Sequence, residues 1–238
     1  MDDLKKKELL YPNLKESEKN NIRWNTGNIA DALDSLGVFG TIPSRLRRVS
    51  GHSKLIIGEA YTVRWAPTRK SGNIKQKQPS TWEQVRSFLV PELSGAHGKV
   101  YVAGAGEFVE EAALAGGLSA TYFQEIGFEG IVLGGAMRDS EQLLNLSIPV
   151  VCSGFCPTDT QGGYRVVETG TFCVLGSLVV NTGDWIVSDG TGTVIIPKLI
   201  KKDVFDLVKQ IEQRESSIFN QIKSNVPLAT LIDEIGWI

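Results

Sequence analysis

Histidine and cysteine are scarce in this sequence, whose 238 residues include 2 His and 3 Cys. So few histidines argue against a histidine-rich metal site and against a catalytic triad built on histidine. The cysteines (Cys152, Cys156 and Cys173) are odd in number, and no further Cys or His lies near the first two to complete a zinc site. We therefore expect buried, reduced thiols, as in a cytoplasmic protein.

An excess of charge of one sign and a long apolar segment are also missing. Lys and Arg together number 25 and Asp and Glu 27, a balance that argues against a general nucleic-acid binder. Residues 1–20 are polar, so we expect no secretion signal, and apolar runs such as 130–137 are too short to span a bilayer. We expect a cytoplasmic protein whose partners include neither nucleic acid nor membrane.

Glycine, in contrast, is abundant, with 25 residues. Glycine permits tight turns and close approach of backbone segments. Hydrophobic residues make up 42% of the chain and charged residues 22%, which is ordinary for a globular protein. The length predicts one domain with appendages, large enough to bury a core without disulfides or a structural metal.

In the central part of the chain, apolar strand patterns alternate with helical patterns. The sequence predicts strands over 55–66, 99–103, 130–134 and 149–154, and helices over 107–126 and 138–146. This alternation predicts an α/β fold with parallel strands. After Cys156 the pattern changes to short strands separated by Gly turns.

Helical patterns flank this region at both ends. Residues 1–37 are predicted to be largely helical, with capping residues at 25–28 and a stop at Gly37. Residues 199–225 are predicted to form an exposed helix. The composition of residues 67–81 predicts a mobile loop with four basic residues, Arg69, Lys70, Lys75 and Lys77. This loop is either solvated, or it serves as a lid or contacts an anion.

Two glycine clusters have competing interpretations. The cluster at 104–106 follows a strand, but Val109 replaces the third glycine of the dinucleotide fingerprint and no P-loop Lys follows, so nucleotide binding has little support. Gly116 and Gly117 interrupt a helical pattern. They indicate either a break between two closely packed helices or a new helix N-terminus whose free amides face an anion.

A third cluster, at 134–137, leads into Arg138 and Asp139 at the carboxyl end of a predicted strand, where α/β sheets bind ligands. Arg138 can bind a carboxylate with two hydrogen bonds, and Asp139 can hold a hard divalent cation. A structural ion pair or a helix cap is the alternative. An anion clamp beside a metal ligand suits a 2-oxo acid, which chelates the metal while an enolate forms.

These segments together resemble the RraA-like family, which includes the 4-hydroxy-4-methyl-2-oxoglutarate and 4-carboxy-4-hydroxy-2-oxoadipate aldolases. The resemblance runs from about Thr26 to Pro197. It rests on the combination of five segments, at 31–37, 58–62, 113–119, 127–139 and 181–197.

The resemblance implies a three-layer β/β/α fold of the swivelling-domain type, assembled as a homotrimer or a dimer of trimers with active sites between subunits. It implies that backbone amides of a turn bind the pyruvyl part of the substrate, that Arg138 contacts substrate and is catalytic, and that Asp139 binds Mg²⁺ or Mn²⁺. The turn falls on Gly116, Gly117, Leu118 and Ser119 here. The implied domains are a helical extension over 1–25, the family domain over 26–198 with a loop insertion at about 67–98, and a helical extension over 199–238.

Two positions depart from the aldolase pattern. Aldolase members carry an Asp twenty-one residues before the arginine, and that position is Gly117 here. They also receive an acidic cluster from the neighbouring subunit, for which Glu212 and Glu215 are the nearest candidates, although Arg214 interrupts them. Glu107, Glu110 or Glu111 could replace the lost carboxylate only if the fold brings one close.

The resemblance therefore predicts a metal-dependent lyase that releases pyruvate by retro-aldol cleavage of a 4-hydroxy-2-oxo diacid, by decarboxylation of oxaloacetate, or by both. One alternative is a non-catalytic regulator that binds proteins, like family members that regulate RNase E. Another is a different small-molecule reaction on the same scaffold, with Trp82 and His97 of the 67–98 segment reshaping the pocket. The methyltransferase label carried by some relatives has no support in these residues.

Overall fold

The computed structural model describes residues 24–68 and 81–235, which fall into two units. Gly40–Lys198 forms the larger unit, and the described parts of Met1–Phe39 and Leu199–Ile238 form the smaller one. The helical structure predicted before residue 24 and nearly all of the predicted basic loop lie outside the described residues. The predicted domain boundaries stay a prediction.

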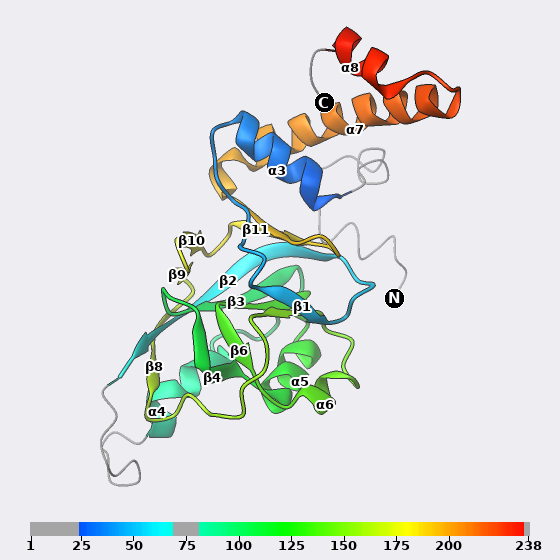
Figure 1. The fold of residues 1–238 in the computed structure, drawn as a ribbon. Helices are drawn as coiled ribbons and strands as arrows, with labels where there is room; N and C mark the ends of the chain where they lie inside the picture. Colours follow the sequence, from blue (N-terminus) through cyan, green and yellow to red (C-terminus); the bar gives the residue numbers. More distant parts are fainter. Residues whose placement is uncertain (1–23, 69–80, 236–238) are drawn as a thin grey trace. The chain divides into compact units, whose positions relative to one another are not determined.

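An eight-stranded sheet forms the centre of the larger unit (Figure 1). The parallel pairs β2–β3, β3–β5 and β5–β7 confirm the parallel α/β arrangement predicted from the sequence. The strands run in the order β1 (Arg47–Ser50), β7 (Val150–Cys152), β5 (Gly130–Leu133), β3 (Lys99–Gly104), β2 (Ile56–Pro67), β11 (Trp185–Ser188) and β12 (Thr193–Ile196), and β8 (Tyr164–Thr169) pairs with β2.

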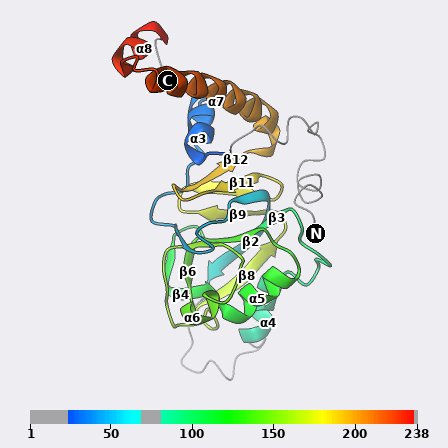
Figure 2. The same ribbon diagram turned by 90° about the vertical axis from the view of Figure 1, so that its right-hand side faces the viewer.

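Each face of this sheet packs on a different layer, because side chains alternate along a strand. Tyr101 belongs to the cluster shared with α4 (Thr81–Val85), α5 (Gly117–Glu125) and α6 (Ser140–Leu143), and its ring stacks on Phe123 with centroids 4.2 Å apart. Its neighbours Val100 and Val102 belong to the opposite cluster, shared with β9 (Phe172–Leu175) and β10 (Leu178–Asn181). Figure 2 shows the three helices gathered on one side of the sheet. These layers confirm the predicted β/β/α fold class.

The helix predicted over 107–126 is wrong in its first half. Residues Val109–Ala115 form strand β4, which pairs in parallel with β6 (Gly135–Met137), and α5 begins only at Gly117. The alanine-rich run favours a helix by intrinsic propensity, but residues 112–115 are all buried, and Ala113 and Ala115 pair with β6. Tertiary pairing outweighs a propensity of a few tenths of a kcal/mol per residue, about the spread between alanine and most other residues.

The helix predicted over 138–146 is shorter than expected, because α6 spans Ser140–Leu143. Beyond the helix, the Gln124 side chain holds the chain in place. Its Oε1 accepts hydrogen bonds from the amides of Ser147 and Ile148, at 2.7 and 3.0 Å, and fixes the segment that leads into β7.

In the smaller unit, α3 (Thr26–Ser35) packs on α7 (Lys201–Lys223), and α8 (Leu228–Ile235) follows. The Asn25 side chain caps α3 by accepting a hydrogen bond from the Gly27 amide at 2.8 Å, and Gly37, with a φ of +68°, follows its end. The helices predicted around residues 26–36 and 199–225 are confirmed. No helix among the described residues is long and apolar enough to cross a membrane.

Candidate active site

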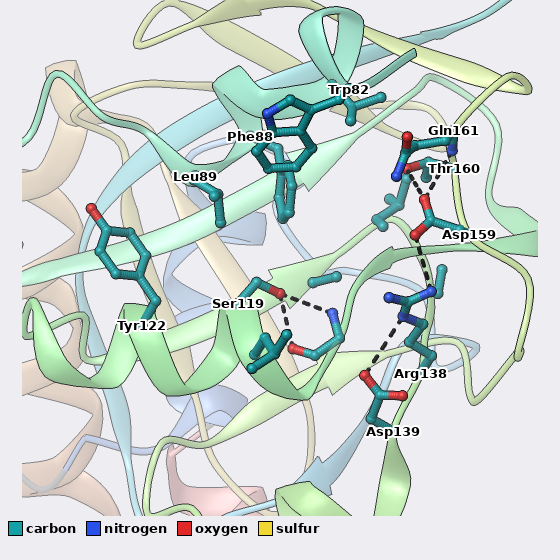
Figure 3. Close-up of a pocket in the computed structure, with 16 residues that line it drawn as sticks. Trp82, Phe88, Leu89, Ser119, Tyr122, Arg138, Asp139, Asp159, Thr160 and Gln161 are labelled. Atoms are coloured by element: carbon teal, nitrogen blue, oxygen red, sulfur yellow. Dashed lines mark hydrogen bonds and ion pairs between the residues drawn. The ribbon is translucent and has the colours of Figure 1, made fainter. Parts of the chain in front are cut away.

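A pocket of about 390 Å³ lies beside the carboxyl ends of β4 and β6 (Figure 3). One side is formed by α4 and the following 3₁₀ helix, Arg86–Leu89, and another by the first turns of α5. Arg138, Asp139 and the segment 159–161 complete it. All of these segments belong to the larger unit.

The β4–β6 pair explains why Gly116 and Gly117 lie next to Arg138 and Asp139, which are about twenty residues further along the sequence. Ala115 is the register partner of Met137, and the amide of Arg138 donates to the carbonyl of Ala115 at 3.1 Å. Parallel strands end at the same edge, so the residues that follow each strand become neighbours. Gly116 and Gly117 consequently lie against Arg138 and Asp139.

The two glycines form the start of α5 directly after β4, so a new helix begins here and the alternative of a break between two helices is wrong; anion binding by its amides stays a prediction. The Ser119 hydroxyl closes this turn, since it accepts from the Gly116 amide and donates to the Gly116 carbonyl, each at 2.9 Å. The amide of Gly117 donates to Asp139 Oδ2 at 2.9 Å. First-turn amides have no partner within the helix and carry its positive dipole end, so this end favours an anion.

Gly116 is required by the close approach of Asp139 and Arg138. A Cβ placed at Gly116 would lie 2.6 Å from Asp139 Oδ2 and 2.9 Å from Arg138 Cγ. Asp139 itself has a φ of +61°, a left-handed conformation that is strained for a residue other than glycine. Such strain is concentrated at functional sites.

Arg138 lies between two carboxylates. Its Nη1 is 3.0 Å from Asp159 Oδ2 and its Nε is 3.6 Å from Asp139 Oδ2. All three side chains are between 35% and 39% exposed, so solvent and a ligand can reach them. The group carries one positive and two negative charges.

Asp159 is a charged site residue that the sequence did not reveal. A bridge between Ala113 and Asp159, with the Ala113 amide on the Thr158 carbonyl at 2.9 Å, holds its segment along β4. Asp159 Oδ1 accepts from the amide of Gln161 at 2.9 Å, an Asx turn that fixes the carboxylate. The "Asp-Thr-Gln-Gly" run after a proline is a turn signal, but nothing in it indicates a position beside Arg138.

The space beside Gly117 is filled by a different oxygen. A Cβ at Gly117 would lie 1.8 Å from Gln142 Oε1 and 2.8 Å from Gln142 Cβ. Gln142 is exposed on α6. The place where an aspartate side chain would begin is thus occupied by the amide of Gln142.

The other acidic residues singled out in the sequence lie elsewhere. Glu110 pairs with Arg45 at 2.6 Å, and Glu111 accepts a hydrogen bond from the Tyr164 hydroxyl. Neither these residues nor Glu107 lines the pocket. Glu212 and Glu215 are on α7 of the smaller unit, where Glu215 accepts from the Asn28 side chain at 2.8 Å. Their contribution to a neighbouring subunit's site stays a prediction.

Of the aromatic and imidazole side chains in the described part of the predicted insertion, Trp82 and Phe88 line the pocket, and His97 does not. His97 packs instead against Gly127, where a Cβ would meet its ring at 2.6 Å. The cysteines are free thiols, as predicted, with Cys152 and Cys173 buried and Cys156 half-buried. Burial raises the pKa of Cys152 to about 11 and that of Cys173 to about 12.

The site chemistry fits a divalent cation such as Mg²⁺. Within the described ranges no three His, Cys, Asp or Glu residues form a cluster that could enclose a metal. Mg²⁺ is nevertheless often held through one or two carboxylates, with water and substrate oxygens as its other ligands. Asp139 offers such a carboxylate, and the net negative charge of the Arg138 group favours a cation.

Sequence comparison finds relatives of mixed description. The chain is 28% identical over 209 residues to protein DlpA of Legionella pneumophila, 87% of this chain, but it spans only about a third (32%) of the length of DlpA. It is 29% identical to the uncharacterized protein MJ0644 of Methanocaldococcus jannaschii, over 74% of this chain and 77% of that protein. A Halalkalibacterium halodurans protein provisionally named as a 4-hydroxy-4-methyl-2-oxoglutarate aldolase is 26% identical, over 83% and 84% of the two chains.

Solved structures share the fold. An uncharacterized protein from Pseudomonas syringae superimposes with a TM-score of 0.70 at 22% identity, covering 90% of this chain and 94% of that one. RraAS2 of Streptomyces coelicolor, described as an unusual member of the RNase ES inhibitor RraA protein family, gives 0.69 at 22% identity, covering 84% and 94%. The RraA-like family model, described as Aldolase/RraA, matches residues 26–195. The match covers most of the chain and includes every pocket residue, and the chain therefore belongs to the RraA-like family.

Proposed function

We propose that this protein is a metal-dependent lyase that acts on small 2-oxo acids and releases pyruvate. The observation that supports it best is the meeting of Arg138, Asp139 and the N-terminus of α5 in one pocket, with the Gly117 amide 2.9 Å from the Asp139 carboxylate. The provisional aldolase name of a relative points the same way. The candidate reactions are retro-aldol cleavage of a 4-hydroxy-2-oxo acid and decarboxylation of oxaloacetate.

In this proposal, Arg138 and the first-turn amides of Leu118 and Ser119 bind the substrate carboxylate. A divalent cation bound by Asp139 would supply the Lewis acidity that stabilises negative charge on the C2 oxygen. The Gln142 amide oxygen lies where the family aspartate would be and can accept a hydrogen bond from water at the site.

Retro-aldol cleavage needs a group that takes the C4 hydroxyl proton while the C3–C4 bond breaks and C3 is later protonated. Among the described residues that line the pocket, Asp159 is the carboxylate that remains once Asp139 is assigned to the metal. We assign this proton to Asp159, which also holds Arg138 in place through the 3.0 Å ion pair. Decarboxylation does not need this step.

The test is pyruvate release from oxaloacetate and from 4-hydroxy-2-oxo acids, with Mg²⁺ or Mn²⁺ and with a chelator. We expect metal-dependent turnover that Arg138→Ala abolishes while its melting temperature changes little, because Arg138 is partly exposed and surface ion pairs contribute less than about 1 kcal/mol. No turnover with either substrate class, across several metals, would contradict the proposal. Co-purification of a ribonuclease or helicase without bound metal would favour the regulatory alternative.

A further inference from the structure

We infer that the pocket selects a 2-oxo acid with a single carboxylate and an apolar group, of about the size of a phenyl ring, at C4. This inference rests on the proposed function and specifies its substrate class. It replaces the diacid that the family resemblance suggests with a 4-hydroxy-2-oxo monoacid. Cleavage of its C3–C4 bond would give pyruvate and an apolar aldehyde, with the C4 hydroxyl proton lost and one proton gained at C3.

Large apolar side chains line the pocket away from the charged group. Figure 3 shows Trp82, Phe88 and Leu89 across the pocket from Ser119, while Arg138, Asp139 and Asp159 lie together on another side. Leu118 and Tyr122 line it from α5, one turn apart on the same helix face. A ligand held by its carboxylate at Arg138 would therefore place its other end among rings and aliphatic carbons.

Several of these side chains are exposed although they are apolar. The exposed fractions are 49% for Trp82, 37% for Tyr122 and 83% for Leu118. Single exposed apolar residues are common, but a group of them around a concave site is typical of ligand-binding surfaces. An apolar group bound there would remove part of this surface from water, which is favourable by roughly 25 cal/mol per Å².

Trp82 and Phe88 form an aromatic wall of the pocket, and contacts with the core hold this wall in place. The Phe88 ring packs on the buried Trp65 with centroids 5.8 Å apart, and the Phe88 carbonyl accepts a hydrogen bond from the buried Tyr101 hydroxyl at 3.0 Å. Trp82 follows Thr81, whose hydroxyl donates to Gln161 Oε1 at 2.9 Å. The wall is thus tied both to the sheet and to the segment that carries Asp159.

The charges that line the pocket disfavour a second substrate carboxylate. Among the described residues around it, the charged side chains are Arg138, Asp139 and Asp159, a sum of +1 − 1 − 1 = −1. A divalent cation and a monocarboxylate bring this sum to −1 + 2 − 1 = 0, whereas a dicarboxylate leaves it at −1. The second carboxylate would also lose water against Trp82 and Phe88, without a described cation to compensate for it.

The volume of about 390 Å³ is adequate for this class of ligand. Small-molecule pockets range from about 300 to 1,000 Å³ and are mostly apolar, with a few polar groups that orient the ligand. Here the charged group can orient the 2-oxo acid and the aromatic wall can bind the C4 substituent.

Two inert analogues test the inference by calorimetry on the full-length protein with Mg²⁺. In 2-oxo-4-phenylbutanoate, C4 carries a phenyl ring, and in 2-oxoglutarate the same carbon carries a carboxylate. Neither has a C4 hydroxyl, so neither can undergo retro-aldol cleavage. We expect the phenyl compound to bind at least about tenfold more tightly, a difference of about 1.4 kcal/mol.

Two variants localise the effect. Trp82→Ala is expected to weaken binding of the phenyl compound by about fivefold or more and to leave that of 2-oxoglutarate within about twofold, since one face of the ring loses its contact. Phe39→Ala, which removes an aromatic side chain that is 69% exposed and does not line the pocket, is expected to change neither. Equal or tighter binding of 2-oxoglutarate, or no effect of Trp82→Ala, would overturn the inference.

The outcomes separate the inference from the function on which it rests. If the phenyl analogue binds as expected but its 4-hydroxy form is not cleaved, the proposed lyase reaction fails and the ligand preference stands. If a diacid is cleaved and preferred, the lyase reaction stands and the inference fails. If neither analogue binds, both are overturned.

Discussion

At the scale of single residues, Arg138 and its two carboxylate neighbours determine what the pocket can do. Asp139, next in sequence, is held by the Gly117 amide, and Asp159, twenty-one positions after Arg138, is held by its own Asx turn. The two carboxylates therefore have different surroundings and can have different roles, metal binding for Asp139 and proton transfer for Asp159.

The role proposed for Asp159 predicts a particular kinetic change. Asp159→Asn keeps a side chain of the same shape but cannot take up a proton, so kcat for retro-aldol cleavage should fall by about 10² to 10⁴-fold. Binding of a 2-oxo acid analogue should change much less, since Arg138 and the α5 amides remain. Steady-state kinetics and calorimetry measure the two effects, and an unchanged kcat would remove Asp159 from the chemistry.

Gly117 and Gln142 should be energetically coupled. Gly117→Ala is expected to destabilise the protein, although alanine favours helices, because its Cβ meets Gln142 Oε1. In a Gln142→Ala background the same change should cost about 1 kcal/mol less, the usual scale for contacting pairs. Urea unfolding of the four proteins measures this coupling. Additive costs would show that the side-chain amide of Gln142 does not determine the cost of Gly117→Ala.

At the scale of elements, the start of α5 connects folding to the site. Ser119, the third residue of α5, should contribute about 1 kcal/mol through its hydrogen bonds to the Gly116 backbone, the usual scale for a hydrogen bond within a protein. Ser119→Ala should therefore lower the free energy of unfolding by that amount. Thr121→Ala on the same helix is the control. Its hydroxyl only back-bonds to the Gly117 carbonyl, so the change should be neutral or slightly stabilising. Equal effects of the two variants would contradict the cap.

Some of the helices and strands could be predicted from sequence patterns, and others could not. Apolar patterns predicted the strands β2, β3, β5 and β7 and the helices α3 and α7, because each has a periodic or continuous buried run and a clear stop signal. They did not predict β4, because Ala112 and Ala113 have helical propensity and the strand depends on tertiary pairing, with β6 on one side and a bridge to Asp159 on the other. The resemblance to the family nevertheless placed Gly116 and Arg138 in one site.

Asp159 could not be found in this way. Its segment has no periodicity, and its position depends on the bridge between Asp159 and Ala113, in the strand that the pattern missed. Gln142 was missed for a related reason. A substitution at Gly117 can be seen in the sequence, but which neighbour fills the resulting space is a matter of tertiary packing.

At the scale of the whole molecule, two buried thiols and two half-buried phenols make stability depend on pH in the alkaline range. In the folded protein, burial raises the pKa of Cys152 to about 11 and that of Cys173 to about 12. The pKa values of Tyr61 and Tyr164 are raised to about 12. Burial is the larger cause for both phenols, followed by the hydrogen bond to Glu92 for Tyr61 and to Glu111 for Tyr164. Above the ordinary thiol value of 9.0 the unfolded chain loses protons before the folded one does. Stability is therefore fully present below about pH 9 and is lost as the pH rises toward these folded values.

Urea unfolding between pH 8 and pH 11 measures this loss. We expect the free energy of unfolding to fall by on the order of 1 kcal/mol per pH unit for each buried thiol above pH 9. Cys152→Ala should make the decline shallower between pH 9 and 11. A free energy that is constant or rises over this range would contradict the burial of these groups.

The proposed lyase reaction requires that the start of α5, Arg138 and Asp139 hold a divalent cation and a 2-oxo acid together. Crystals grown with Mn²⁺ and oxalate, an inert analogue of the pyruvate enolate, test it most directly. We expect an anomalous Mn²⁺ peak in contact with the Asp139 carboxylate, and oxalate bound to Arg138. We expect Mn²⁺ and oxalate to be lost from crystals of Arg138→Ala and of Asp139→Ala. Mn²⁺ and oxalate bound elsewhere, or absent at saturating concentrations, would contradict it.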